Sequence, residues 1–318
     1  MTHLSLEFYK KQAQKLKKSF LHETNSLDRI LAVYPRFKKD SLSLSESQFV
    51  IAREQGFESW PKFKKYIELQ NFNGVRFIIH GKLKSFLAKS AVKKPIDLVW
   101  EEHRSLKDWI ESLQIPHTEI GRISVNSKNA SLNERLQNKD IVEVFEIEGP
   151  YDPRKISQQQ EKLLPEIKFI ADVHLGKLVR YLRILGLNCS YEAPWDDNIL
   201  AEKSFKEKRI MLSRDVGLLQ RKCISHGQFL YSDDPVEQAK EILQRYEIYD
   251  QCKAMSRCVS CNSYMHPVAK HKIEHLIEEG TKNTYDQFFQ CESCSKVYWH
   301  GAHVKNILKT LKEIAGGI

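Results

Sequence analysis

Three aspartates are the strongest candidates in this sequence for a site that uses carboxylate groups. Asp172 follows the short apolar run FIA, and Asp215 closes a second such run, RIMLSRD. Both runs predict short buried strands. Because residues just past the carboxyl ends of neighbouring parallel strands meet in one crevice, we expect these two carboxylates to share a site. Asp197, or its neighbour Asp196, precedes another predicted helix and can supply a third carboxylate.

Carboxylates gathered in this way suit a hard divalent cation. Mg²⁺ and Mn²⁺ prefer oxygen ligands and keep several waters, so three acids around one crevice suffice. Such an ion can activate water and relieve charge on a leaving oxygen, which is what phosphodiester hydrolysis needs. The competing interpretation of any one aspartate is a helix cap. Three such positions in one unit favour the metal site.

Basic side chains accompany the acids. Arg214, beside Asp215, is a candidate for phosphate contact, or else for an ion pair that holds the aspartates. On the helix predicted from 175 to 185, three cations fall on one part of the helical wheel, where they could bind a phosphate backbone. The alternative is that these side chains form an ordinary solvent-exposed face of the helix with no ligand. These candidate nucleic-acid-binding residues are Lys177, Arg180 and Arg183.

Four cysteines form a second candidate site. They occur as two CxxC pairs, Cys258 with Cys261 and Cys291 with Cys294. Two such pairs present four thiolates to one ion, so they predict a tetrahedral structural zinc site. Iron–sulfur or redox use is disfavoured because both pairs lie in polar loops. The nearby run Tyr298-Trp299-His300 is a candidate for stacking on RNA bases, with packing inside the protein as the alternative.

Regular alternation of strand and helix positions the aspartates. Strands are expected at 167–172, 189–192, 209–213 and 228–231, with helices at 175–185, 199–208, 216–223 and 235–246. This alternation over residues 166–250 predicts an α/β domain with a parallel sheet. Residues 251–318 are expected to hold the zinc ribbon and a final helix at 303–314. The polar composition of residues 150–165 predicts a linker.

The first half of the chain predicts two further units. Residues 1–72 show helical periodicity and an excess of basic residues, typical either of an arm that touches RNA or of a small docking module. Residues 74–149 predict two strands, a helix begun by a capping box at Ser105 to Asp108, and two more strands. That order is that of an α+β, ubiquitin-like β-grasp fold. Its closing strand resembles the sulfur-carrier proteins, but the chain continues past Gly149, so carrier chemistry is not expected.

Size and charge agree with a multidomain protein that binds a polyanion. The chain has 318 residues, which predicts two or three domains rather than one. A net charge of +9 suits a nucleic-acid partner. No apolar run is long enough to span a membrane, and the N-terminus lacks the pattern of a signal peptide, so a cytoplasmic location is expected.

The runs IADVHLGKLVRYLRILG, DD, RIMLSRDVGLL, SRCVSCN and FFQCESCSKVYWHGAH resemble the Mut-seven C-terminal RNase domain family, over about residues 167–310. The resemblance implies a PIN-like nuclease fold joined to a zinc ribbon, with a ubiquitin-like unit as a familiar companion. It implies metal-dependent RNA cleavage with Asp172, Asp197 and Asp215 as the acidic set. His174 departs from the family, which has a small or apolar residue there.

These observations support one leading hypothesis, a Mg²⁺- or Mn²⁺-dependent ribonuclease with a structural Zn²⁺. RNA is the expected partner, and a protein partner for the β-grasp unit is left open. The main alternative is a non-catalytic RNA- or ribosome-binding protein in which the acids are caps. Divalent-dependent turnover of RNA separates the two.

Overall fold

A computed structural model of the chain describes residues 5–20, 24–35, 37, 40–157, 159, 162–193, 195–302, 304 and 309. The chain divides into two compact units. The first is Met1–Arg76 together with Asp97–Glu101 and Gln137–Asp140, and the second is the remainder. Within the described residues no helix is both long enough and apolar enough to cross a membrane.

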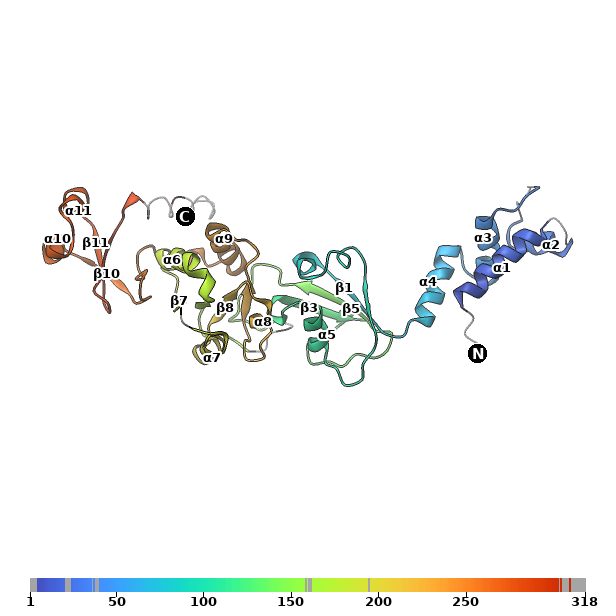
Figure 1. The fold of residues 1–318 in the computed structure, drawn as a ribbon, viewed down its shortest axis with the longest axis horizontal. Helices are drawn as coiled ribbons and strands as arrows, with labels where there is room; N and C mark the ends of the chain where they lie inside the picture. The colour runs from blue at the N-terminus through green and yellow to red at the C-terminus, as the bar shows by residue number, and fades with distance from the viewer. Residues whose placement is uncertain are drawn as a thin grey trace. The chain divides into compact units, whose positions relative to one another are not determined.

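Residues before 72 form the helical segment that the sequence predicts. Ser43 begins the third helix with a capping box to Glu46, and Ser59 caps the fourth ahead of Pro61. Both are signals that start helices at these positions. The helices bury one apolar cluster that includes Leu16, Val50 and Phe63. Their bounds are α1 (Leu6–Ser19), α2 (Thr24–Val33), α3 (Leu44–Glu54) and α4 (Trp60–Asn71) (Figure 1).

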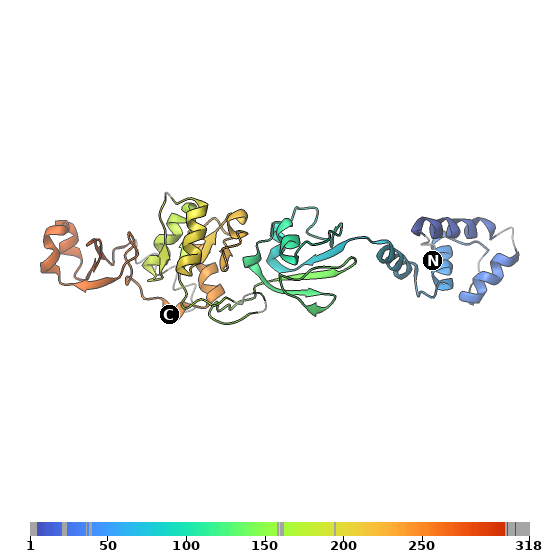
Figure 2. The same ribbon diagram turned by 90° about the horizontal axis from the view of Figure 1, so that it is seen from below.

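The β-grasp region, residues 74–149, contains a five-stranded sheet in the order β2-β1-β5-β3-β4. Helix α5 (Leu106–Ser112) starts at the predicted capping box of Ser105 and Asp108, and its Trp109 packs on Phe77 of the sheet. The first strand, expected at 75–83, ends at Ile79, and a 3₁₀ helix follows it. The elements are β1 (Val75–Ile79), η1 (Gly81–Phe86), β2 (Ile96–Leu98), η2 (His117–Glu119), β3 (Ile120–Val125), β4 (Lys128–Asn129) and β5 (Ile141–Glu146) (Figure 2).

The parallel-sheet region, residues 166–250, has four parallel strands in the order β7-β6-β8-β9. Helices α6 and α9 bury apolar side chains on one face of this sheet, and α7 and α8 do so on the other (Figure 1). The predicted parallel α/β sheet is confirmed. Its elements are β6 (Phe169–Ala171), η3 (Val173–Leu175), α6 (Gly176–Ile184), β7 (Cys189–Ser190), α7 (Asp197–Glu207), β8 (Ile210–Ser213), α8 (Val216–Leu219), β9 (Gly227–Phe229), α9 (Pro235–Tyr246) and η4 (Tyr249–Gln251).

The ribbon region, residues 251–302, contains an antiparallel sheet in the order β10-β11-β12. A helical insertion separates its first two strands. The helix predicted at 303–314 lies outside the described residues except for Val304 and Lys309. The elements are β10 (Met265–Val268), α10 (Lys270–Ile273), η5 (Glu274–Leu276), α11 (Glu279–Thr284), β11 (Phe288–Cys291) and β12 (Val297–Trp299).

The predicted linker at 150–165 packs against the parallel-sheet region where it is described. Leu164 is buried in the core beneath α6 and α9, and Tyr151 lies against Tyr246. The backbone N–H of Tyr151 also donates to the carbonyl of Arg245 at 2.7 Å. The described residues of this segment therefore pack on the domain rather than forming a free tether.

Candidate active site and metal centre

The acid pocket lies at the carboxyl ends of strands β6 and β8, where the sequence places two aspartates. It has a volume of about 620 Å³. Topology brings its walls together, because β6 and β8 are adjacent parallel strands and their ends face the same edge. Its lining includes three of the predicted acids and also residues that the sequence analysis did not single out. The lining residues are Asp172, Val173, His174, Leu175, Asp197, Arg214, Asp215, Val216, Asp233 and Gln238.

Asp172 is the buried carboxylate of the acid pocket, with 7% of its surface exposed. Ser213 Oγ, at the end of β8, donates to Asp172 Oδ2 at 2.8 Å, and the same hydroxyl accepts from the backbone N–H of Asp215 at 2.9 Å. A single serine therefore joins the ends of the two strands and orients Asp172. This role of Ser213 could have been suspected from the sequence, because Ser213 ends the predicted strand just before Asp215.

Asp215, Asp196 and Asp197 differ in what their side chains do. Asp215 caps α8 by accepting from the N–H of Leu218 at 3.2 Å. Asp196 caps α7 by accepting from the N–H groups of Asn198 and Ile199, both at 2.9 Å. Asp197 lines the acid pocket and lies 3.5 Å from Arg221. Of the two neighbours, the structure thus gives Asp196 the cap and places Asp197 at the pocket.

Arg214 holds the wall of the acid pocket. Its Nη1 donates to the carbonyls of Leu230 at 3.0 Å, Tyr231 at 2.9 Å and Ser232 at 2.5 Å, and its Nη2 pairs with Asp233 Oδ1 at 2.6 Å. All of these contacts join the Arg214 guanidinium to the segment that follows β9. This geometry favours the ion-pair interpretation of Arg214 over direct phosphate contact.

The prediction that Arg183 binds nucleic acid is wrong. Its residue surface is 4% exposed, and its guanidinium donates to the carbonyls of Cys189, Val259 and Ser260 at 2.9–3.0 Å. Burial lowers the pKa of this arginine. A helical wheel predicts which residues share a face of α6. It cannot predict that the ribbon packs against the part of the helix that contains Arg183. Lys177 and Arg180 are exposed on the same helix.

Arg183 belongs instead to a contact between the parallel-sheet and ribbon regions. The Asn262 side-chain amide donates to Asn188 Oδ1 at 2.8 Å, while its Oδ1 accepts from the N–H of Cys189 at 3.1 Å. Gly186 has φ +88°, and a Cβ there would lie 2.2 Å from the Lys253 carbonyl. A glycine is therefore required where the chain after α6 meets the start of the ribbon.

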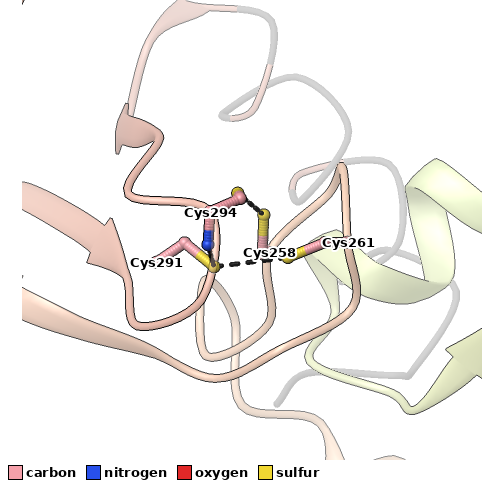
Figure 3. Close-up of side chains that lie close together, drawn as sticks. All are labelled: Cys258, Cys261, Cys291 and Cys294. Atoms are coloured by element: carbon pink, nitrogen blue, oxygen red, sulfur yellow. Dashed lines mark hydrogen bonds between the residues drawn. The ribbon is translucent and has the colours of Figure 1, made fainter.

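The four-cysteine cluster is already assembled. Cys258 Sγ lies 3.6 Å from Cys294 Sγ, and Cys261 Sγ lies 3.4 Å from Cys291 Sγ; all four sulfurs lie within 4.8 Å of one another (Figure 3). A tetrahedral site with Zn–S bonds of about 2.3 Å separates its sulfurs by about 3.8 Å, so the cluster fits zinc. Disulfides, with bonds of about 2.05 Å, do not fit these separations.

Local backbone geometry builds each half of the cluster. In both CxxC turns the residue after the second cysteine has a positive φ, 67° at Asn262 and 58° at Ser295. In the second turn, the N–H groups of Ser293 and Cys294 both point to Cys291 Sγ at 3.4 Å. Donors of this kind stabilise a thiolate. Tyr298 lies with its hydroxyl 3.3 Å from Cys258 Sγ, which supports packing within the ribbon for this aromatic residue.

The acid pocket is arranged more loosely than the cysteine cluster. Among the described residues, the four cysteines are the only group of three or more His, Cys, Asp or Glu side chains close enough to hold one ion directly. Carboxylates are nevertheless the ligands that Mg²⁺ and Mn²⁺ prefer, and such ions usually bind a protein through only one or two carboxylates and keep several waters. The four cysteines thus form a closed cage, and Asp172, Asp197 and Asp215 do not.

Comparison with known proteins agrees with the resemblance found in the motifs. Residues 167–311 match the family model described as Mut7-C RNAse domain, and residues 72–152 match the one described as Mut7-C ubiquitin. No curated protein and no solved structure matches the chain. The resemblance is confirmed by these two matches, which lie in the order that the motifs predict, with the ubiquitin-like region ahead of the RNAse domain.

Proposed function

We propose that this protein is a metal-dependent ribonuclease with a PIN-like parallel-sheet domain, and that the acid pocket is its active site. The observation that carries the proposal is the meeting of Asp172, Asp197 and Asp215 in one pocket at the carboxyl ends of parallel strands. The Mut7-C RNAse family match over the same residues supports nuclease chemistry at the level of the family.

Each acid has a separate part in this proposal. Asp172, oriented by Ser213, is the fixed carboxylate at the base of the pocket. Asp215 and Asp197 approach from the starts of α8 and α7 and complete the set that would hold Mg²⁺ or Mn²⁺. When bound, such an ion supplies an activated water and relieves negative charge on the leaving oxygen. The expected products are 3′-hydroxyl and 5′-phosphate ends.

RNA would reach the acid pocket over the exposed basic side of α6. This helix begins directly after the segment containing Asp172 and His174, and Lys177 and Arg180 are exposed on its first turns. Cations beside an acidic site hold a phosphate backbone without reading its sequence. The ribbon, through a structural zinc, would stabilise the other end of α6 by its contacts with Arg183.

The decisive experiment measures turnover of a mixed single-stranded and structured RNA pool by the purified full chain with Mn²⁺. The double variant Asp172→Asn, Asp215→Asn keeps side-chain size and removes two charges. We expect it to lose at least about a hundredfold in rate, because the variant could no longer hold the divalent ion that would stabilise charge at the reacting phosphate. Zinc content is measured in both proteins.

Asp196→Asn is the matched control. It changes a neighbouring aspartate to a residue that caps helices equally well, so activity is expected to persist. Equal residual turnover in the wild type and the double variant would mean that the RNA is cut by a contaminant, and the proposal would then be abandoned.

A second candidate function has one specific observation in its favour. Asp172 and Asp215 each already have a hydrogen-bonding partner, Ser213 Oγ and the N–H of Leu218, as purely structural acids would. The protein would then be a non-catalytic RNA-binding protein. RNA binding that survives EDTA, with no turnover under any divalent ion, would establish that alternative.

A further inference from the structure

The 3₁₀ helix η2 of the β-grasp region buries three consecutive polar residues. His117, Thr118 and Glu119 are only 6%, 2% and 3% exposed. Buried polar groups are almost always hydrogen-bonded, and several of the partners here come from the parallel-sheet region. One nitrogen of His117 lies 2.8 Å from the carbonyl of Ile224, and Gln220 donates to the carbonyl of Glu111 at 3.0 Å.

Among the described strands, β9 is the last of the parallel sheet, so one side of its backbone faces no other strand there. Leu230 donates to Ser213 in β8, so the N–H of Phe229 points to the open side. Glu119 Oε1 accepts from that N–H at 2.8 Å. On the same side, Arg245 Nη2 donates to the carbonyl of Gly227 at 3.4 Å. Backbone groups that an edge strand would otherwise expose are therefore bonded to one acid and one arginine.

Glu119 and Arg245 also bind each other. Arg245 Nη1 lies 2.8 Å from Glu119 Oε1 and 2.9 Å from Oε2, and Nη2 donates to the carbonyl of Thr118 at 3.1 Å. Burial alone would lower the pKa of Arg245, but the neighbouring Glu119 raises it overall; burial raises the pKa of Glu119, and the charge of Arg245 opposes that rise. A buried ion pair is a weak source of stability, and its best-attested use is to fix one arrangement of its surroundings.

The backbone that this ion pair holds leads into the acid pocket. Phe229 lies opposite Ser213 in the sheet register, and Ser213 orients Asp172. Immediately after β9, Glu241 accepts from the N–H groups of Tyr231 and Ser232, both at 2.9 Å. Asp233 then lines the pocket. From η1, Phe86 packs edge-on against Phe229 at a centroid distance of 4.9 Å.

We propose that the β-grasp region is a structural part of the nuclease site: Glu119 and Arg245 bind the open edge of β9 and so position the segment 229–233 that walls the acid pocket. The partner of η2 is thus the sheet edge of the same chain rather than a separate protein. The two residues are positioning residues, and their link to catalysis rests on the proposed function.

The test measures amide hydrogen exchange in the full chain without RNA or divalent ion, for wild type, Glu119→Ala and Glu119→Gln. Alanine removes the acceptor of the Phe229 N–H and the partner of Arg245, so exchange at amides 229–232 is expected to rise at least about tenfold. Glutamine keeps a neutral acceptor, so the Phe229 amide is expected to be protected better than in the alanine variant. Asp97→Asn, in an exposed Arg76–Asp97 pair, is the matched control.

A second measurement separates positioning from general loosening of the fold. With RNA and Mn²⁺, we expect Glu119→Ala to lower kcat about tenfold or more, and Glu119→Gln to lower it less, while KM for RNA and zinc content stay near wild type in both. If Glu119→Ala leaves exchange at 229–232 unchanged, or if kcat is unchanged while that segment opens, the positioning proposal is wrong. If wild type protects 229–232 and does not cleave RNA, the proposed function fails, while the structural role of the ion pair stands.

Discussion

The cysteine cluster and the acid pocket bring their candidate metal ligands together in two different ways. The cysteines come from two short turns with the same backbone geometry, and their sulfurs already lie at separations that fit one zinc ion. The carboxylates come from different strand ends and helix starts, and Asp172 is oriented by a serine of the neighbouring strand. A cage of soft ligands must be complete to hold its ion, whereas a hydrated Mg²⁺ or Mn²⁺ tolerates carboxylates that are farther apart.

Removal of one thiolate is expected to have the largest effect on the protein. Cys291→Ser leaves three sulfur ligands in a cluster whose metal binding, in structural zinc sites, contributes about 10–16 kcal/mol. We expect stoichiometric zinc to be lost and amide protection across 256–299 to disappear, as measured by metal analysis and hydrogen exchange. Cys223→Ser, at an exposed cysteine outside the cluster, is the control and should retain zinc. Full zinc occupancy in Cys291→Ser would contradict the four-thiolate site.

The acid pocket is expected to respond in a graded way. Asp197→Asn should weaken Mn²⁺ binding at least about tenfold, whereas Asp196→Asn should change it by less than about twofold, because asparagine still caps α7. Electron paramagnetic resonance of free Mn²⁺ measures both affinities directly. The opposite order of effects would assign the ligand to Asp196 and the cap to its neighbour.

The smallest effect is expected on the basic side of α6. Lys177→Gln and Arg180→Gln should each raise the dissociation constant for single-stranded RNA severalfold and reduce the slope of log affinity against log salt by about 0.7. Titrations at several salt concentrations measure this slope. Lys208→Gln, at the far end of α7 from Asp197, is the control and should leave the slope unchanged. Equal slopes in all four proteins would remove α6 from the RNA-binding surface.

Much of the parallel-sheet region was predictable, because its signals are local. The helix predicted at 235–246 is present as Pro235–Tyr246, begun by Asp234 and the proline as helix-start chemistry requires. The strands ending near Asp172 and Asp215 are short, wholly buried runs, as their apolar residues predicted. The roles of Arg183 and Arg214 were not predictable in the same way, since each is determined by carbonyl groups far away in the sequence.

The order of helices and strands, the two CxxC turns and the candidate acids at strand ends could be predicted from local sequence, since each depends on neighbours within a few residues. Packing between distant segments places Asp197 rather than Asp196 at the pocket, buries Arg183 against the ribbon and brings Glu119 to the edge of β9. These contacts could not be predicted locally, because buried polar groups must find partners and those partners depend on how distant segments pack.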